Sequence, residues 1–216
     1  MKKNYKFVIC RGSTDCSNSV IETMDLIQKI DQICDKYLTK KFSSAIIPYH
    51  QLLKIYISHC PNGCSRPQIA DIGIIGASVP QVSDDSCSGC GECTIACREK
   101  AVIINQEPFK PIIDYDKCLY CAECIRACSD GVLKSKISGY RIIFGGKLGR
   151  HPRLGIDLGK IFTEEETLKI ITDILTKMGS KIDSSHRVSD LVVQAMLDLL
   201  PDDIDRKKIM KAKDRS

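Results

Sequence analysis

Residues 58–77, SHCPNGCSRPQIADIGIIGA, decide the fold prediction because they place a cysteine-containing loop between two predicted strands. Ahead of this stretch, apolar residues alternate with other residues over 52–59, which predicts a half-buried strand that runs straight into Cys60. Inside it, the short apolar run IGIIG predicts a further strand over residues 72–76. Cys60 and Cys64 are therefore expected beside the end of a strand.

The N-terminal part predicts one strand and one helix. The run YKFVI predicts a strand over residues 5–9. Apolar residues at steps of three or four predict an amphipathic helix over residues 18–38, and Ser19-x-x-Glu22 has the form of a capping box near its start. Cys34 lies on the apolar stripe of this helix, and we interpret it as a buried core cysteine.

The C-terminal part predicts another strand and two helices. GYRIIFG predicts a strand over residues 139–145, and the glycine- and cation-rich loop GGKLGRHPRLG follows at residues 145–155. Thr163-x-x-Glu166 is expected to begin a helix, and a last amphipathic helix is predicted over about 187–200. Strands and helices do not alternate regularly along the chain, which indicates the α+β class.

The composition favours a cytoplasmic protein that binds metal. Of its residues 43% are hydrophobic, so a normal core is possible without disulfide bonds, and no apolar run approaches the roughly 18 to 20 residues of a membrane span. No signal peptide is recognised, and 13 cysteines in a reducing compartment indicate metal ligands. The net charge is +5, but basic and acidic residues are interspersed except in the run RKKIMKAKDR, so we predict no nucleic-acid partner. The positive charge would instead compensate anionic cofactors.

An internal repeat occupies the middle of the chain. Two cysteine motifs stand 31 residues apart: Cys87-x2-Cys90-x2-Cys93-x3-Cys97 and Cys118-x2-Cys121-x2-Cys124-x3-Cys128. Both match the run that binds 4Fe–4S clusters in bacterial ferredoxins, in which the fourth cysteine reaches the other cluster. The first cluster is then expected on Cys87, Cys90, Cys93 and Cys128. The second is expected on Cys118, Cys121, Cys124 and Cys97.

Two points bear on this interpretation. Zinc sites also use C-x2-C pairs, but they usually combine two such pairs and not a C-x2-C-x2-C-x3-C run. Arg98 and Ser129 stand where ferredoxins usually have proline, which removes no ligand. We therefore predict an inserted two-cluster ferredoxin domain at residues 84–136, with residues 1–83 and 137–216 forming the outer domain.

The outer domain resembles the siroheme and 4Fe–4S domain of the nitrite and sulfite reductases. The resemblance rests on C-P-N-x-C followed by a D-I-G-x-x-G-like strand, on the C-x5-C spacing of Cys10 and Cys16, and on GYRIIFGGKLGRHPRLG, with a weaker match at HRVSDLV. The ferredoxin insertion is similar to that of dissimilatory and anaerobic sulfite reductases. The expected fold is thus a siroheme/4Fe–4S domain with an inserted dicluster domain.

The resemblance also implies cofactors and site residues. Four cysteines would bind a third 4Fe–4S cluster: Cys10, Cys16, Cys60 and Cys64. Cys64 would also bridge to the siroheme iron, and with Arg66 it is our candidate for the catalytic site. The siroheme carboxylates call for cations and for close backbone approach. Candidate cofactor-binding residues are Asn62, Arg66, Gly145, Gly146, Lys147, Gly149, Arg150 and Arg153.

The implied activity is the six-electron reduction of sulfite to sulfide. Electrons would pass from the ferredoxin clusters through the cluster bridged by Cys64 to siroheme. Nitrite is the alternative substrate, and a non-catalytic electron-transfer subunit is the alternative function. Expected partners are an electron donor, such as ferredoxin or another reductase subunit, and either a second copy or another subunit that completes the substrate pocket. Arg11, Lys54 and His59 are the further candidates for that pocket.

Overall fold

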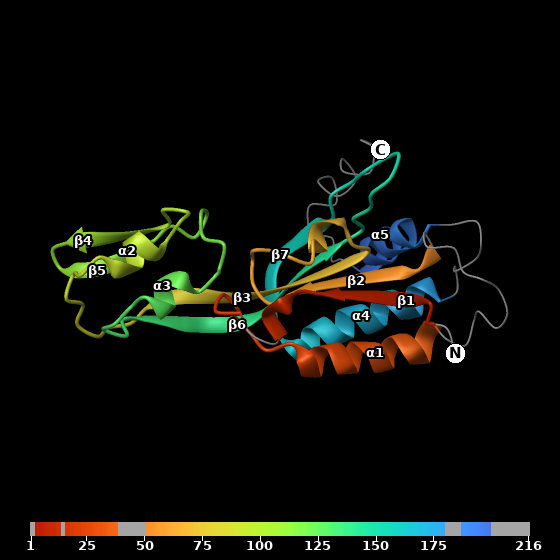
Figure 1. The fold of residues 1–216 in the computed structure, drawn as a ribbon, viewed down its shortest axis with the longest axis horizontal. Helices are drawn as coiled ribbons and strands as arrows, with labels where there is room; N and C mark the ends of the chain where they lie inside the picture. The colour runs from red at the N-terminus through yellow and green to blue at the C-terminus, as the bar shows by residue number, and fades with distance from the viewer. Residues whose placement is uncertain (1–2, 14–15, 39–50, 180–186, 200–216) are drawn as a thin grey trace.

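The computed structural model describes residues 3–13, 16–38, 51–179 and 187–199. A body built on a five-stranded sheet is joined to a smaller lobe that contains a two-stranded sheet (Figure 1). No helix among these described residues is both long and apolar enough to cross a membrane. The basic run RKKIMKAKDR lies outside the described residues.

The sheet of the body has the order β1-β2-β3-β6-β7. Strands β1, β2 and β3 are parallel, whereas β6 is antiparallel to both of its neighbours. The strand bounds are Tyr5–Ile9, Leu53–Ser58, Ile72–Val82, Leu133–Phe144 and Ile156–Phe162. The strands predicted at 5–9 and 52–59 are confirmed, and those predicted at 72–76 and 139–145 are longer than expected. Strand β7 was not predicted.

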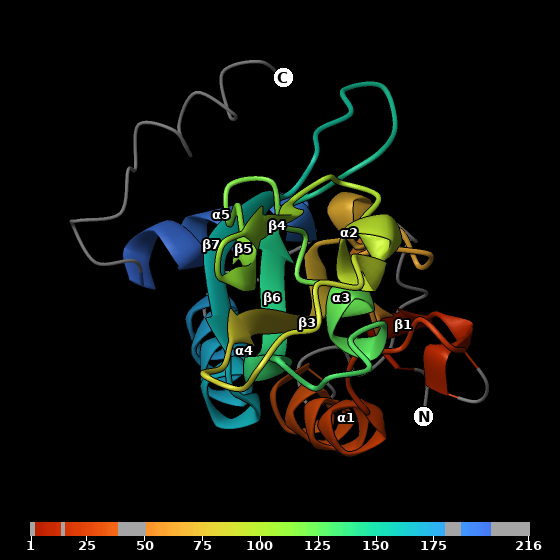
Figure 2. The same ribbon diagram turned by 90° about the vertical axis from the view of Figure 1, so that its left-hand side faces the viewer.

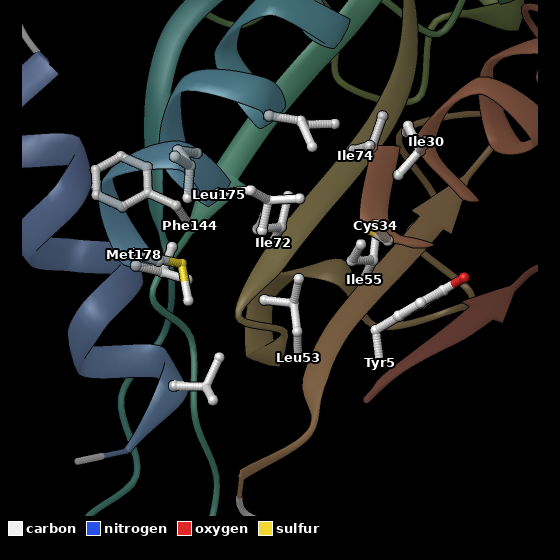
Figure 3. Close-up of a cluster of buried hydrophobic side chains, with 14 of the residues drawn as sticks. Tyr5, Ile30, Cys34, Leu53, Ile55, Ile72, Ile74, Phe144, Leu175 and Met178 are labelled. Carbon is white, nitrogen blue, oxygen red and sulfur yellow. The ribbon is translucent and has the colours of Figure 1, made fainter. Parts of the chain in front are cut away.

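Helices α1 (Met24–Leu38) and α4 (Glu164–Met178) lie along one face of this sheet (Figures 1 and 2), and α5 (Val188–Leu199) packs against α4 and β6. Figure 3 shows how alternate residues of β2 and β3, such as Leu53 and Ile72, meet helix residues such as Leu175 in one core. Cys34 is fully buried within this core, as predicted.

The two predicted capping boxes have different outcomes. Thr163 and Glu166 form a reciprocal capping box at the start of α4, so that prediction is confirmed. The helix predicted from residue 18 begins only at Met24, so the box at Ser19 is wrong. Instead the Glu22 carboxylate accepts hydrogen bonds from the backbone N–H groups of Thr23 and Met24, which satisfies two donors of the first turn.

The short 3₁₀ helix η4 (Pro67–Ile69) packs against β3. Gly73 makes this approach possible, because a Cβ atom there would lie 2.3 Å from the Pro67 carbonyl oxygen. Residues on β2 alternate between the two faces, so Ile55 faces the helices while Lys54 and Tyr56 are directed away from them. Lys54 and Tyr56 therefore line a pocket on the other face of the sheet.

The lobe is carried by the long β3–β6 ribbon, which continues outward from the body (Figure 1). It contains α2 (Glu92–Ala96), β4 (Val102–Gln106), β5 (Phe109–Ile113) and α3 (Glu123–Arg126), around a small core of its own. The repeat is visible in the backbone. The 31-residue offset relates Gly89 to Tyr120 and Gly91 to Ala122, and all four have positive φ. Since β6 begins before residue 137, the lobe and the body share a continuous strand.

Candidate metal centres and cofactor site

The outer cysteines are brought together by the parallel pairing of β1 and β2. Cys10 directly follows β1 and Cys60 lies two residues after β2, so both stand at the carboxyl edge of these strands. The Cys10 backbone N–H donates to the Ile57 carbonyl at 3.1 Å, which fixes the two strand ends against each other. A tight turn after Cys60, in which Gly63 N–H donates to the Cys60 carbonyl, carries the chain on to Cys64.

All four outer cysteines line one cavity of about 510 Å³, together with Arg11, His59 and Asn62. Burial raises the pKa of the Cys60 thiol. A hydrogen bond from the Asn62 backbone N–H lowers this pKa, and the neighbouring Cys10, Cys16 and Cys64 raise it. The shared cavity brings the four thiols to one place at the edge of the sheet. A bound cluster would hold them as thiolates, and the positive charge of its iron ions would offset the repulsion between those thiolates.

The lobe cysteines form two groups, and each group mixes the two sequence motifs. Burial raises the pKa of Cys93, the neighbouring Thr94 lowers it, and Cys128 and Cys87 raise it. Burial is the main cause that raises the pKa of Cys124 to about 12, and the nearby Cys118, Cys121 and Cys97 contribute to the same increase. The last cysteine of each motif therefore lies with the first cysteines of the other motif. Cys90 is exposed.

Several of these sulfur atoms already accept backbone hydrogen bonds. Ala101 N–H donates to Cys97 Sγ at 3.2 Å, and Leu133 N–H donates to Cys128 Sγ at 3.4 Å. Such donors stabilise a thiolate.

Within the described part of the chain, no group of three or more His, Cys, Asp or Glu side chains is gathered closely enough to hold a single metal ion.

One cavity reaches from the lobe to the body. It is lined by Cys60, Pro61 and Asn62 of the body and by the cysteine group of Cys97, Cys118, Cys121 and Cys124. The Ser78 backbone N–H of β3 donates to the Tyr120 carbonyl at 2.9 Å and holds the two parts together at this point. The lobe group that contains Cys97 is therefore the one beside the outer cysteines.

The glycine-rich loop packs against η4, and η4 follows the Cys64 turn in the sequence. A Cβ atom at Gly145 would lie 2.2 Å from Val193 Cγ2, and one at Gly146 would lie 2.5 Å from the Gln68 carbonyl oxygen. Contacts inside the protein therefore account for these two glycines. Gly149 has φ +113° and open space where a Cβ atom would lie.

The predicted cations differ in their surroundings. Arg153 is turned inward, where its Nε donates to the Gly145 carbonyl at 2.9 Å and its Nη2 lies 3.1 Å from an Asp190 carboxylate oxygen. Lys147 Nζ lies 3.5 Å from the same carboxylate. Arg66 and Arg150 are exposed, and Arg66 has a left-handed backbone with φ +62°. The structure thus gives Arg153 a role in fixing the loop to α5.

A cation-lined pocket on the face opposite the helices was not identified from the sequence as a unit. Lys54, Lys147 and Arg187 line it, with Tyr56 and Ile69 among the other lining residues. Lys54 is one of the substrate-pocket candidates from the sequence, whereas Arg187 is not among them. Its position in HRVSDLV, just before α5, was the only available signal.

A buried carboxylate lies beside this pocket. Asp71 is 1% exposed, accepts the Lys54 backbone N–H at 2.7 Å and lies 3.7 Å from Lys54 Nζ. Burial raises the pKa of Asp71 to about 6, although Lys54 acts to lower it. This carboxylate holds Lys54 in place at the pocket wall.

His59 lies within the cavity of the outer cysteines and is 1% exposed. Its Nδ1 lies 3.2 Å from Cys10 Sγ and its Nε2 lies 2.6 Å from Thr23 Oγ1. Burial lowers the pKa of His59, and Glu22 opposes this effect. The side chain is thus a fully hydrogen-bonded polar group that also touches a candidate cluster ligand.

The fold and the grouped thiols are those expected of an iron–sulfur protein. Comparison with known proteins agrees. The family model described as "Nitrite and sulphite reductase 4Fe-4S domain" matches residues 1–187. The chain therefore belongs to the nitrite and sulfite reductase 4Fe–4S domain family.

Relatives with sulfite reductase names support this assignment. The chain is 36% identical over 178 residues to a coenzyme F420-dependent sulfite reductase from Methanocaldococcus jannaschii, which covers 82% of this chain and 27% of that protein. It is 35% identical over 95 residues to one of the subunits of an anaerobic sulfite reductase from Salmonella typhimurium, which covers 44% and 25% respectively. The chain thus spans about a quarter of the length of these relatives.

A solved structure shares the mixed α/β fold. The crystal structure of dissimilatory sulfite reductase I superposes with a TM-score of 0.55 at 15% identity, over 95% of this chain and 51% of the other. At this level of identity the likeness concerns the fold alone.

Proposed function

We propose that the chain is the cofactor-binding part of a siroheme sulfite reductase. The observation that carries the proposal is the single cavity lined by Cys10, Cys16, Cys60 and Cys64 at the carboxyl edge of β1 and β2. Four neighbouring thiols suit a 4Fe–4S cluster, and the family assignment supports a cluster at this place. Cys64, the exposed member, is the residue we assign as the bridge to siroheme.

The lobe is proposed to be a two-cluster ferredoxin domain spanning residues 84–136. The crossed grouping of its cysteines supports this assignment, because Cys97 lies with the second motif and Cys128 with the first. The chain would then hold three 4Fe–4S clusters. The cavity shared by Cys60 and the Cys97 group supports an electron path from the Cys87 group through the Cys97 group to the outer cluster.

The cation-lined pocket is proposed to hold siroheme carboxylates. Lys54, Lys147 and Arg187 supply positive charge there, and exposed Arg66 stands two residues after Cys64. Arginine and lysine are suited to carboxylate groups. Bound siroheme would supply the iron at which sulfite is reduced to sulfide. In this role Asp71 orients Lys54, while Arg153 and Asp190 hold the loop that carries Lys147.

The remaining part of the substrate pocket is proposed to come from outside this chain, either from a second copy or from another subunit. The chain covers about a quarter of the length of its sulfite reductase relatives. Nitrite is the alternative substrate, because the family includes both activities in its description. The electron donor would be ferredoxin or another reductase subunit that meets the lobe.

Absorption spectroscopy of anaerobically purified protein tests the proposal. A siroheme band together with iron and sulfide for three clusters would support it. Iron and sulfide in amounts that fit two clusters, without a siroheme band, would contradict the proposal and indicate an electron-transfer subunit. Turnover driven by reduced methyl viologen, measured with sulfite and with nitrite at equal concentrations, then distinguishes the two substrates.

A further inference from the structure

Close contacts with neighbouring residues fix both the ring and the backbone of His59. A Cβ atom at Gly12 would lie 2.6 Å from His59 Cβ and Cγ, so only glycine leaves room for the imidazole beside Cys10. The His59 carbonyl accepts the Val20 N–H at 3.0 Å, and Gly76 approaches the same carbonyl closely. The backbone and the ring of His59 are therefore both fixed.

Two hydrogen bonds run from His59 to one sulfur atom. The ring Nδ1 lies 3.2 Å and the backbone N lies 3.4 Å from Cys10 Sγ. A cysteine that binds a cluster is a thiolate and has no proton to give. With the cluster bound, Nδ1–H must therefore be the donor to sulfur.

Thr23 then fixes the ring in this tautomer. Its hydroxyl lies 2.6 Å from Nε2, and Thr23 is itself only 1% exposed. Because Nδ1 carries the proton, Nε2 is an acceptor and the Thr23 hydroxyl donates to it. Thr23 stands directly before α1, so the helix that closes the core also holds the donor in place.

We propose that His59, oriented by Thr23, is a positioning residue that raises the reduction potential of the outer cluster through its hydrogen bonds to Cys10. The inference rests on the proposed function, in which Cys10 is a ligand of that cluster. Reduction adds one negative charge to the cluster and its sulfur atoms, and hydrogen bonds to the sulfurs stabilise that charge. The effect would draw electrons from the lobe into the body.

EPR-monitored redox titration of the whole purified protein tests this proposal. In His59→Leu and in Thr23→Val the outer cluster should titrate at a more negative potential than in wild type. A tenfold change in the reduction equilibrium would appear as a shift of about 59 mV for this one-electron couple. His59→Asn should stay close to wild type, because its amide N–H stands near the position of Nδ1–H.

The lobe clusters serve as internal references, and their potentials should not move in any variant. His151→Leu, on the exposed loop, is the matched histidine control and should leave all potentials unchanged. If His59→Leu cannot hold the outer cluster, Thr23→Val decides, because it keeps the ring and removes only the hydroxyl.

An unchanged outer-cluster potential in the variants that retain the cluster would overturn the inference and leave the proposed function standing. A wild-type protein that shows no third cluster signal would overturn both.

Discussion

The lobe and the body bring cysteines together in different ways. In the lobe, each motif holds its candidate ligands within a short run, and the fold brings cysteines of the two runs together. In the body, Cys10 and Cys60 meet only because β1 and β2 pair in parallel and end at one edge. The proposed lobe centres can therefore be recognised from spacing, whereas the proposed body centre depends on the assembled sheet.

Replacing Cys64 breaks the body centre and should have the largest effect. We expect Cys64→Ser to lose sulfite reduction and the coupling between cluster and siroheme, because the thiolate that joins them is gone. The lobe clusters should keep their EPR signals, since none of their cysteines is changed. Activity with reduced viologen and EPR spectra of the reduced protein measure both parts.

Cys34→Ala is the matched control for that change. Cys34 is the cysteine that belongs to none of the three proposed cluster sites, and it lies fully buried in the core. It should lower stability without removing any cluster signal. Full turnover in Cys64→Ser would show that the bridging assignment is wrong.

The crossed grouping in the lobe can be tested with paired variants. Cys97→Ser and Cys118→Ser should alter the same EPR signal, while Cys128→Ser and Cys87→Ser should alter the other. We expect the first pair to slow electron arrival in the body more than the second, because their cluster shares the cavity with Cys60. If Cys97→Ser alters the signal that Cys87→Ser alters, each motif binds its own cluster and the crossed assignment fails.

Substitution of Gly145 distinguishes a role in packing from a role in cofactor binding. We expect Gly145→Ala to lower the free energy of unfolding by about 2–4 kcal/mol, because an alanine there overlaps Val193 and has φ +75°. Gly159→Ala is the matched control, with φ +70° and open space, and should lose about 1–2 kcal/mol. Thermal unfolding measures both. Loss of siroheme from Gly145→Ala with unchanged stability would instead indicate direct contact with the cofactor.

The smallest expected effect is a pH dependence that comes from Asp71. Its folded pKa of about 6 lies above the unfolded value, so the native state binds more protons between these values. The stabilisation is complete below the unfolded pKa and is lost as pH rises through about 6. We expect wild type to lose about 2–3 kcal/mol relative to Asp71→Asn across this window. Melting temperatures at a series of pH values should show it, with Asp116→Asn, an exposed carboxylate, as control.

The sequence predicts what short-range spacing determines. The strands at both ends of the Cys60 loop, the burial of Cys34 and the capping box at Thr163 all follow from local patterns, and the structure confirms them. The capping box at Ser19 fails because Glu22 supplies the cap instead. The spacing of a capping box in the sequence does not determine which backbone N–H groups its side chains will bind.

Contacts between distant segments could not be predicted in the same way. Arg153 resembles a free cation in the sequence, but it is held by Asp190 of α5. Gly145 has the appearance of a cofactor-approach residue, but Val193 fills the space beside it. Arg187 joins Lys54 at one pocket only through the packing of α5. Each of these depends on tertiary packing that no local pattern records.

Anomalous diffraction at the iron edge from anaerobically grown crystals of the whole chain tests the central claim most directly. The account predicts iron density at three cluster positions, of which one lies in the cavity lined by Cys10, Cys16, Cys60 and Cys64. Iron at the two lobe positions alone, with the outer thiols unliganded, would contradict it.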